Sequence, residues 1–190
     1  MNLPHAAVCF SDALWHKRSM ITRSHIKGDA PSTAVYSDCE RFRYSLIRVW
    51  DIEARRVAFV MLNPSTATEE QNDPTIHRCE QRARRLGFGG FCAVNLFALR
   101  ATDPRDMKVA DDPTGPDNAQ AISEAARWAD MVIAAWGVHG AHRGAGPATA
   151  AQLRVEGRAL HHLGLTKAGH PRHPLYLSYS AEPQIWTATD

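Results

Sequence analysis

The sequence predicts several strands, and at the end of four of them lie polar side chains that could bind a heterocyclic ligand. In open parallel sheets a ligand binds outside the carboxyl ends of the strands, so residues at these positions are the first to consider for chemistry. In chain order they are Asn63-Pro64-Ser65, Asn95, Trp136-Gly137 with His139, and His170 with His173. The sequence therefore predicts that two amides and several imidazoles converge on one cleft.

The residue types in this set differ in how strongly they indicate a binding site. Asn95 is informative, because an amide that ends an apolar strand must find hydrogen-bond partners when it is buried. Asn63 precedes Pro64, and because Asn-Pro is a common turn dipeptide, a structural turn is an alternative there. Trp136 is expected to pack in the core. Gly137 is expected to permit a close backbone turn near a ligand.

Hydrophobic patterning predicts the elements that position these residues. Residues 57–62 are apolar at every position, as expected for a strand covered on both faces. Asp73 and Pro74 suit the N-cap and first position of a helix that runs to about Leu86 and ends at Gly87. A strand, a loop and a helix in this order open a βαβ unit.

The same order of elements recurs along the chain. Further strands are predicted at 91–94, 131–136 and about 164–166, with helices at about 117–129 and 147–162. We therefore predict an α/β fold, a three-layer sandwich around a central, mostly parallel four-stranded sheet, with an additional N-terminal β-hairpin.

The N-terminal part of the chain divides into two regions. Residues 1–33 show no clean period and end in a turn-rich stretch, so they are predicted to form an appended, poorly structured arm. Residues 35–50 alternate like a strand at a half-exposed sheet edge. Phe42, Tyr44 and Leu46 are expected on one face, and Arg41, Arg43 and Ser45 on the other. Residues 34–190 are predicted to form a single α/β domain.

The strand-end motifs resemble those of the uracil-DNA glycosylase superfamily. Residues 61–65, Met-Leu-Asn-Pro-Ser, are similar to the first-strand loop of the branch that carries Asn-Pro-Gly there. Residues 93–100 are similar to the second strand, whose asparagine reads the pyrimidine edge. Residues 133–137 resemble the third-strand Trp-Gly motif, and residues 170–175 resemble the closing His-Pro-Ser-Pro-Leu loop. The likeness covers about residues 57–178, and it implies a uracil-DNA glycosylase-like fold.

A closer resemblance, from about residue 35 onward, is to a family of bacterial and phage proteins known as domain of unknown function 1643. The matching signatures are Leu62-Asn63-Pro64-Ser65-Thr66-Ala67, Asp73-Pro74-Thr75-Ile76, Asn95-Leu96-Phe97-Ala98 and Pro171-Arg172-His173-Pro174-Leu175-Tyr176. That family carries no established activity, so function has to be argued from the site.

The glycosylase resemblance implies hydrolysis of the N-glycosidic bond of a modified or damaged base in DNA, through an oxocarbenium-like transition state. Carried over by residue, Asn63 would position the attacking water and Asn95 would pair with the base edge. His173 or His170 would donate to the base as it leaves as an anion. An amide at position 63 cannot take a proton at neutral pH, so catalysis would depend on positioning and electrostatics.

The resemblance also implies a wider substrate-binding set and shows two further departures from the superfamily. The set comprises Asn95, Pro64, Ser65, Phe97, Trp136, Gly137 and His139. Phe97 is the aromatic side chain nearest to the site in sequence. Ser65 replaces the usual glycine, and Arg172-His173 stand where a single serine is expected.

Arginine makes up 18 of the 22 basic residues. Since arginine grips phosphates and planar carboxylates bidentately, this bias indicates either a nucleic-acid or nucleotide ligand or an arginine-rich coding composition. Four basic residues in loops near the strand ends are the predicted phosphate contacts: Arg100, Arg143, Lys167 and Arg172. A helical stripe, Arg78, Arg82 and Arg85, is either a solvated face or a phosphate-contacting surface.

Metal binding is an alternative that two histidine pairs raise. His139 with His142, and His170 with His173, could hold zinc from neighbouring loops, but no acidic residue lies close in sequence to complete a catalytic site. We predict no metal and no other cofactor. The four cysteines include no C-x-x-C pair, so neither a disulfide framework nor a zinc ribbon is expected.

The longest apolar runs are about six residues, against roughly 20 for a membrane span. A cytoplasmic protein without a membrane partner is therefore expected. The leading hypothesis is a nucleobase-binding protein of uracil-DNA glycosylase-like type, with DNA or a nucleotide as its ligand and N-glycosidic hydrolysis as the implied activity. The alternatives are a non-catalytic nucleic-acid or nucleotide sensor and a metal-dependent hydrolase that uses the loop histidines.

Overall fold

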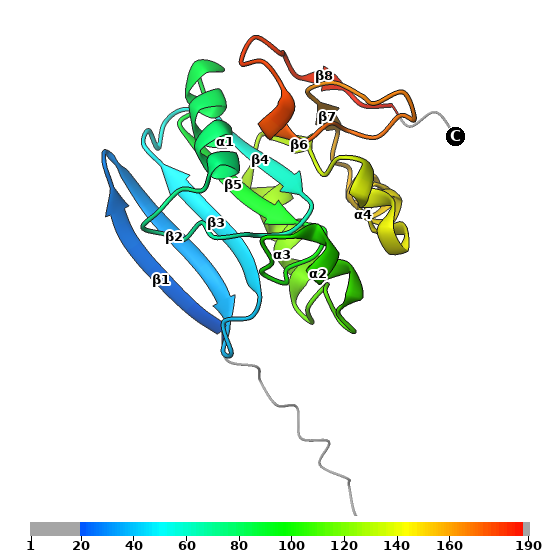
Figure 1. Ribbon diagram of the computed structural model, residues 1–190. Helices are drawn as coiled ribbons and strands as arrows, with labels where there is room; N and C mark the ends of the chain where they lie inside the picture. The colour runs from blue at the N-terminus through cyan, green and yellow to red at the C-terminus, as the bar shows by residue number, and fades with distance from the viewer. Residues whose placement is uncertain (1–19, 188–190) are drawn as a thin grey trace, which may run out of the picture.

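The fully apolar stretches of the chain form central strands of one mixed β-sheet. In the computed structural model, which describes residues 20–187, eight strands lie in the order β1-β2-β3-β5-β4-β6-β7-β8 (Figure 1). They are β1 (Met20–Lys27), β2 (Ala30–Ser37), β3 (Arg43–Val49), β4 (Arg56–Met61), β5 (Gly90–Asn95), β6 (Met131–Ala134), β7 (Leu160–His162) and β8 (Gln184–Ile185). Parallel pairing is confined to β5-β4, β4-β6 and β6-β7, and the other four neighbouring pairs are antiparallel.

The predicted three-layer sandwich around a mostly parallel four-stranded sheet, with a separate N-terminal β-hairpin, is wrong, although the fold is α/β. The sheet has eight strands and most of its pairings are antiparallel. The physical reason is that β3 pairs directly with β5, Leu46 opposite Ala93 and Val49 opposite Gly90, so β1, β2 and β3 extend the main sheet. At the far edge β8 adds another antiparallel strand beside β7.

The predicted N-terminal arm falls only partly within the structure. Residues 1–19 lie outside the described residues. Residues 20–33 form β1 and the first half of β2, which pair from Met20 opposite Ser37 to Lys27 opposite Ala30. The division of the chain into an arm and one α/β domain stays a prediction.

Helices cover both faces of the sheet because its central strands are apolar on both sides (Figure 1). Phe59 lies in the same buried cluster as Cys79 of α1 on one face, whereas its neighbour Val60 lies in the cluster of the other face, with Ile122 of α3 and Leu153 of α4. The helices are α1 (Pro74–Arg85), α2 (Pro104–Val109), α3 (Asn118–Trp128) and α4 (Ala145–Val155), with 3-10 helices at Val138–Gly144 and Pro174–Tyr176. The predicted cap of α1 is confirmed, since the Asp73 carboxylate accepts a hydrogen bond from the Ile76 N–H at 2.8 Å.

A β-bulge in β3 changes which side chains face α1. Val35 lies opposite Ser45, but the next residue, Tyr36, lies opposite Arg43, so Tyr44 is an extra residue in the strand. Directly paired residues share a face of the sheet. Arg43 therefore lies on the same face as Tyr36, and it is buried, with 1% of its surface exposed. The simple alternation predicted for residues 41–46, with Arg43 on a half-exposed edge, is wrong because the bulge resets it.

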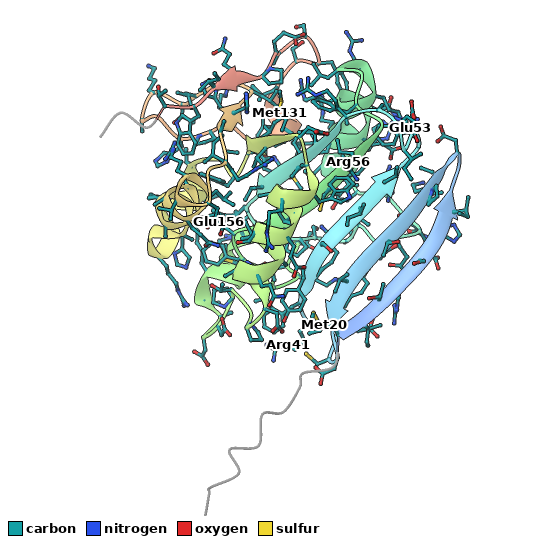
Figure 2. The ribbon with its side chains drawn as sticks, turned by 180° about the vertical axis from the view of Figure 1, so that it is seen from behind. Met20, Arg41, Glu53, Arg56, Met131 and Glu156 are labelled. Atoms are coloured by element: carbon teal, nitrogen blue, oxygen red, sulfur yellow. The ribbon has the colours of Figure 1, made fainter. Side chains whose placement is uncertain are left out.

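The carboxyl ends of the parallel strands lie side by side and position the predicted site. Met61 of β4 is in register with Asn95 of β5, and Val60 is in register with Ala134 of β6. Arg56 and Met131, which begin β4 and β6, mark the opposite end of the sheet in the rear view of Figure 2. Ligand-binding side chains are expected beyond Met61, Asn95 and Ala134.

Candidate functional site

A cavity of about 610 Å³ lies at the carboxyl ends of β4 and β6. Its walls come from the segment after β4, the start of α1, the segment after β6 and the loop before the second 3-10 helix. Of the residues predicted from the sequence, it is lined by Asn63, Ser65, Trp136, Gly137, His139, Arg172 and His173. Its volume falls in the range of small-molecule sites, which is about 300–1,000 Å³.

A smaller cavity of about 40 Å³ adjoins the first. Arg43, Pro64 and Asn95 line only this inner cavity. Five residues line both cavities: Asn63, Ser65, Asp73, Thr75 and His173. The predicted amides and one predicted imidazole are therefore brought together by the fold, around two cavities of different size that share part of their walls.

Asn95 is buried in the inner cavity without a hydrogen-bond partner for its side chain. It is 1% exposed, and neither Oδ1 nor Nδ2 is bonded within residues 20–187. Leaving a buried polar group unpaired costs about 1–3 kcal/mol, so proteins rarely bury one without a reason. Its backbone carbonyl accepts a bond from Asn118 Nδ2 at 2.9 Å, which anchors the main chain and does not use the Asn95 side chain.

Backbone contacts fix the orientation of the Asn63 amide. Its Nδ2 donates to the carbonyls of Pro64, at 3.0 Å, and Ala101, at 2.7 Å. Both bonds use the nitrogen, so Oδ1 is the atom that the side chain offers to the cavity. An anchored amide oxygen can accept a hydrogen bond from water or from a ligand N–H, but it cannot act as a base.

His173 is held as a neutral imidazole. Burial lowers its pKa to about 4, although the nearby Asp73 carboxylate opposes the shift. Nδ1 accepts a bond from the Leu175 N–H at 3.4 Å, so at neutral pH the ring proton lies on Nε2. A neutral ring in this tautomer can donate a hydrogen bond to a negative charge that develops in the cavity.

Asp73 is a cavity residue that sequence reasoning assigned only a structural role. It is 8% exposed, and its Oδ1 caps α1 at 2.8 Å from the Ile76 nitrogen. Among the described residues, no hydrogen bond uses Oδ2. The sequence could have indicated this role. The helix that Asp73 caps is the next element after the strand that precedes Asn63, and a helix in that position begins at the ligand-binding edge of the sheet. Asp73 therefore supplies the carboxylate that the predicted site lacked.

Trp136 forms a wall of the main cavity. It is buried as predicted and packs edge-on against Trp186, with ring centroids 5.5 Å apart. A Cβ atom on Gly140 would lie 2.0 Å from Trp136 Cδ1, so the indole fits only because that residue is glycine. Gly137 has a φ of 71° and donates to the Pro171 carbonyl at 2.8 Å, which joins the segment after β6 to the His173 loop.

Of the other predicted binding residues, Phe97 and His170 lie outside both cavities, whereas His139 lies in the wall of the main one. Phe97 is buried in the core, where its ring centroid lies 5.6 Å from that of His142. His170 donates its backbone N–H to Thr166 Oγ1. His139 lines the main cavity, where its Nδ1 lies 3.1 Å from Lys108 Nζ. Burial and the Lys108 charge lower the His139 pKa.

The predicted phosphate contacts divide into one cavity residue and three residues elsewhere. Arg172 is exposed and lines the main cavity. Arg100 stacks on the Tyr36 ring, and Arg143 donates to the carbonyls of Ala110 and Asp111. Lys167 is exposed on the surface. Their role in phosphate binding stays a prediction.

The arginine stripe of α1 contributes to structure. Arg82 is 0% exposed and donates to the carbonyls of Leu177, Ser178, Tyr179 and Ala181, so neither interpretation from the sequence holds for it. Arg78 also donates to the Leu177 carbonyl, at 2.9 Å. These two side chains attach the segment that follows the His173 loop to α1. Arg85, at the end of the helix, is exposed.

Metal-ligating side chains do not cluster in the part of the chain that the structure describes. No group of three or more His, Cys, Asp or Glu residues there could hold a metal ion. The described cysteines, Cys39, Cys79 and Cys92, are all free thiols. Within residues 20–187, no helix has the length and apolar character that crossing a membrane requires.

Comparison with known proteins identifies a family for this chain. A family model described as "Protein of unknown function (DUF1643)" matches residues 43–175. This span runs from Arg43 to Leu175 and so includes every residue of the inner cavity and all but Tyr176 of the main one. Neither a curated protein nor a solved structure matches the chain.

Proposed function

Since the chain belongs to the DUF1643 family, whose description assigns no activity, we propose its function from the geometry of the site. We propose that it binds a nucleobase, in DNA or in a nucleotide, and hydrolyses the N-glycosidic bond of that base. The base would lie in the main cavity, with its polar edge toward the inner cavity. The proposal includes the uracil-DNA glycosylase-like activity that the strand-end motifs imply, but not the fold.

The observation that carries the proposal is the unpaired amide of Asn95. It offers a donor group and an acceptor group to the inner cavity, which adjoins a main cavity large enough for a heterocycle. The edge of a nucleobase presents the complementary pair of groups, and enzymes that act on a flipped base read it by such hydrogen bonds. A purely structural asparagine would instead bond to the surrounding protein, as Asn118 does with two carbonyls.

Three side chains around the cavity supply the groups that hydrolysis needs. Each side chain is hydrogen-bonded to the backbone through one polar atom, which leaves a second polar atom for the cavity. The bonded atoms are Asn63 Nδ2, Asp73 Oδ1 and His173 Nδ1. Asn63 Oδ1 and Asp73 Oδ2 would hold the water, and His173 Nε2–H would face the base. Positioned donors and acceptors of this kind stabilise charge without reorganisation during the reaction.

In the proposed reaction, water replaces the base on the sugar carbon C1′. The glycosidic C1′–N bond breaks, and its electron pair stays on the base, which leaves as an anion hydrogen-bonded to His173 Nε2. The water oxygen bonds to C1′, and one water proton moves to Asp73. That proton later neutralises the base, so the products are the free base and the hydroxyl form of the sugar.

The test is base release from single-stranded and duplex oligonucleotides that carry uracil or a modified pyrimidine. We expect release by the wild-type protein and at least a hundredfold loss of rate in Asn63→Ala, His173→Ala and Asp73→Asn, in line with the usual contribution of about 10²–10⁴ from acid–base groups. Asn is as good an N-cap as Asp, so Asp73→Asn removes the carboxylate and keeps the helix cap.

Asp103→Asn is the matched control. Asp103 caps α2 in front of a proline, as Asp73 caps α1, but it does not line either cavity. It should leave the release rate unchanged. If the wild-type protein binds these oligonucleotides without releasing a base, and Asn95→Ala weakens that binding, the protein is a sensor. If it neither binds nor releases, the proposed function is wrong.

A further inference from the structure

We infer that the inner cavity is a subsite for an exocyclic oxygen of the base, and that Arg43 together with Asn95 selects such oxo bases over amino bases. This inference depends on the proposed function, and it adds to it the class of base and a residue that the strand-end motifs do not contain. It is carried by the placement, burial and incomplete bonding of Arg43.

The bulge at Tyr44 is what places Arg43 in the inner cavity. Without the extra residue, Arg43 would face the opposite side of the sheet from Leu46 and Arg48, since odd and even positions of a strand alternate. With it, Arg43 lies on the face covered by α1, opposite Tyr36 and within the walls that also contain Asn95. Bulges of this kind commonly re-aim a side chain near a functional site.

Arg43 is incompletely bonded for a buried cation. Its guanidinium donates to one partner, the Ala67 carbonyl at 2.7 Å, and Nε has no partner among the described residues. The buried Arg48 is different: it pairs with Glu80 at 2.9 Å and also donates to Ser32, Thr68 and Asn72. No ion pair involves Arg43 within residues 20–187, so its remaining donors are available to an acceptor.

The charge of Arg43 persists in this position. Burial lowers its pKa to about 10, and the negative charge of Asp73 opposes that shift, so the side chain is protonated at neutral pH. A buried cationic donor with unused N–H groups strongly favours an oxygen acceptor, because hydrogen bonds from charged donors are about twice as strong as neutral ones.

The size and donor pattern of the inner cavity define the ligand group. At about 40 Å³ it is close to the share of liquid volume of one water, about 30 Å³, so it admits an exocyclic atom while the ring stays in the main cavity. Arg43 Nε and Asn95 Nδ2 are donors, and Asn95 Oδ1 is an acceptor. A carbonyl oxygen beside a ring N–H, as in uracil, can accept from both donors and donate to the Asn95 oxygen. The amino group of cytosine would instead place its own N–H donors against those of Arg43 and Asn95.

The test is direct calorimetric binding of two pairs of free bases that differ in oxo against amino substitution: uracil with cytosine, and hypoxanthine with adenine. We expect the wild-type protein to bind the oxo member of each pair about 10- to 100-fold more tightly, the discrimination that one or two unpaired buried donors produce. Arg43→Met should reduce that preference to less than threefold, because it removes the donors and keeps a side chain of similar length.

Two further variants keep the result interpretable. Arg127→Met is the control, since Arg127 is an exposed arginine of α3 that lines neither cavity, and it should keep the full preference. If Arg43→Met does not fold, Arg43→Lys, which keeps a charge but loses the planar donor set, should still lower the preference at least fivefold.

The outcomes separate this inference from the proposed function. If the wild-type protein binds bases with equal affinity for the oxo and amino members, or if the Arg43 variants keep the wild-type preference, the subsite assignment is wrong while base binding stands. If the wild-type protein binds none of the four bases and releases none from oligonucleotides, both proposals fail together.

Discussion

Replacing Asn95 with leucine should stabilise the protein while it abolishes base binding. Leucine has nearly the shape of asparagine but no polar atoms, so Asn95→Leu removes a buried amide whose oxygen and nitrogen are both unpaired within the described residues. Unpaired buried polar groups cost about 1–3 kcal/mol. Functional sites often keep such groups at the expense of stability.

The expected gain can be measured by thermal and urea unfolding. We expect the free energy of unfolding to rise by about 1–2 kcal/mol, which for a chain of this length raises the melting temperature by about 2–8 °C. Asn118→Leu is the matched control, because Asn118 is equally buried and shares an unpaired Oδ1, but its Nδ2 donates to two carbonyls, at 2.9 and 3.0 Å. It should destabilise the protein by about 1–3 kcal/mol. If Asn95→Leu destabilises the protein as Asn118→Leu does, the Asn95 amide is a structural group and the assignment of the inner cavity is refuted.

Three other predictions concern the groups around the site. The pKa of His173 is about 4 in the folded protein, against its ordinary value of 6.5 in the unfolded chain. Between pH 4 and pH 6.5 the unfolded state therefore binds more protons. The contribution of His173 to the free energy of unfolding should therefore fall by about 2–3 kcal/mol as pH drops from 6.5 to 4, and urea titrations should show a smaller loss in His173→Gln. Gly140→Ala should lower the free energy of unfolding by about 2 kcal/mol or more, because the added Cβ would overlap Trp136. Gly144→Ala is the control: Gly144 has a φ of 67° and open space around it, so only the left-handed penalty of about 1–2 kcal/mol is expected. Equal losses in thermal unfolding would contradict this packing argument. Arg82→Met should raise amide hydrogen exchange in the segment after the second 3-10 helix at least tenfold, and unchanged exchange would mean that its carbonyl contacts do not hold that segment.

The sequence was most informative where one local rule determined the element. The apolar run at 57–62 and the Asp73-Pro74 cap predicted a buried strand and the helix after it, and the structure has β4 at Arg56–Met61 and α1 at Pro74–Arg85. Burial on both faces and a side-chain cap are properties of a few adjacent residues. Such elements can be predicted without knowledge of their partners.

Elements that depend on distant partners were predicted less well. The helix predicted to run from 147 to 162 ends at Val155, because Gly157 follows with a φ of 76° and the chain then enters β7 at Leu160. The strand predicted near 164–166 is therefore wrong. β7 has only three residues, and it exists as a strand because it pairs with β6 and β8. Periodicity over three residues carries no such information.

The candidate site shows the same division between local and distant information. Asn63, Asn95 and His173 were identified because each lies at a strand end or in a recognisable motif, and the fold brings all three together. Arg43 was missed because alternation places it on the other face, and only the pairing of β2 with β3 shows the bulge. A register shift is a property of two strands, so one strand's sequence does not determine it.

In the mechanism that we propose, the charges of Asp73 and Arg43 act together. Before the reaction, the buried cavity holds one positive guanidinium, one negative carboxylate and a neutral His173. When Asp73 takes the proton of the attacking water, its negative charge is lost at the moment when the leaving base acquires one. The net charge beside Arg43 therefore stays the same, with the base oxygen replacing the carboxylate as its counter-charge. A low-dielectric cavity favours such a transfer, because the Arg43 guanidinium has a negative partner both before and after the base leaves. The losses of base-release rate caused by Asp73→Asn and Arg43→Met should therefore not be additive in the double variant, since each substitution removes one of the two charges that act together.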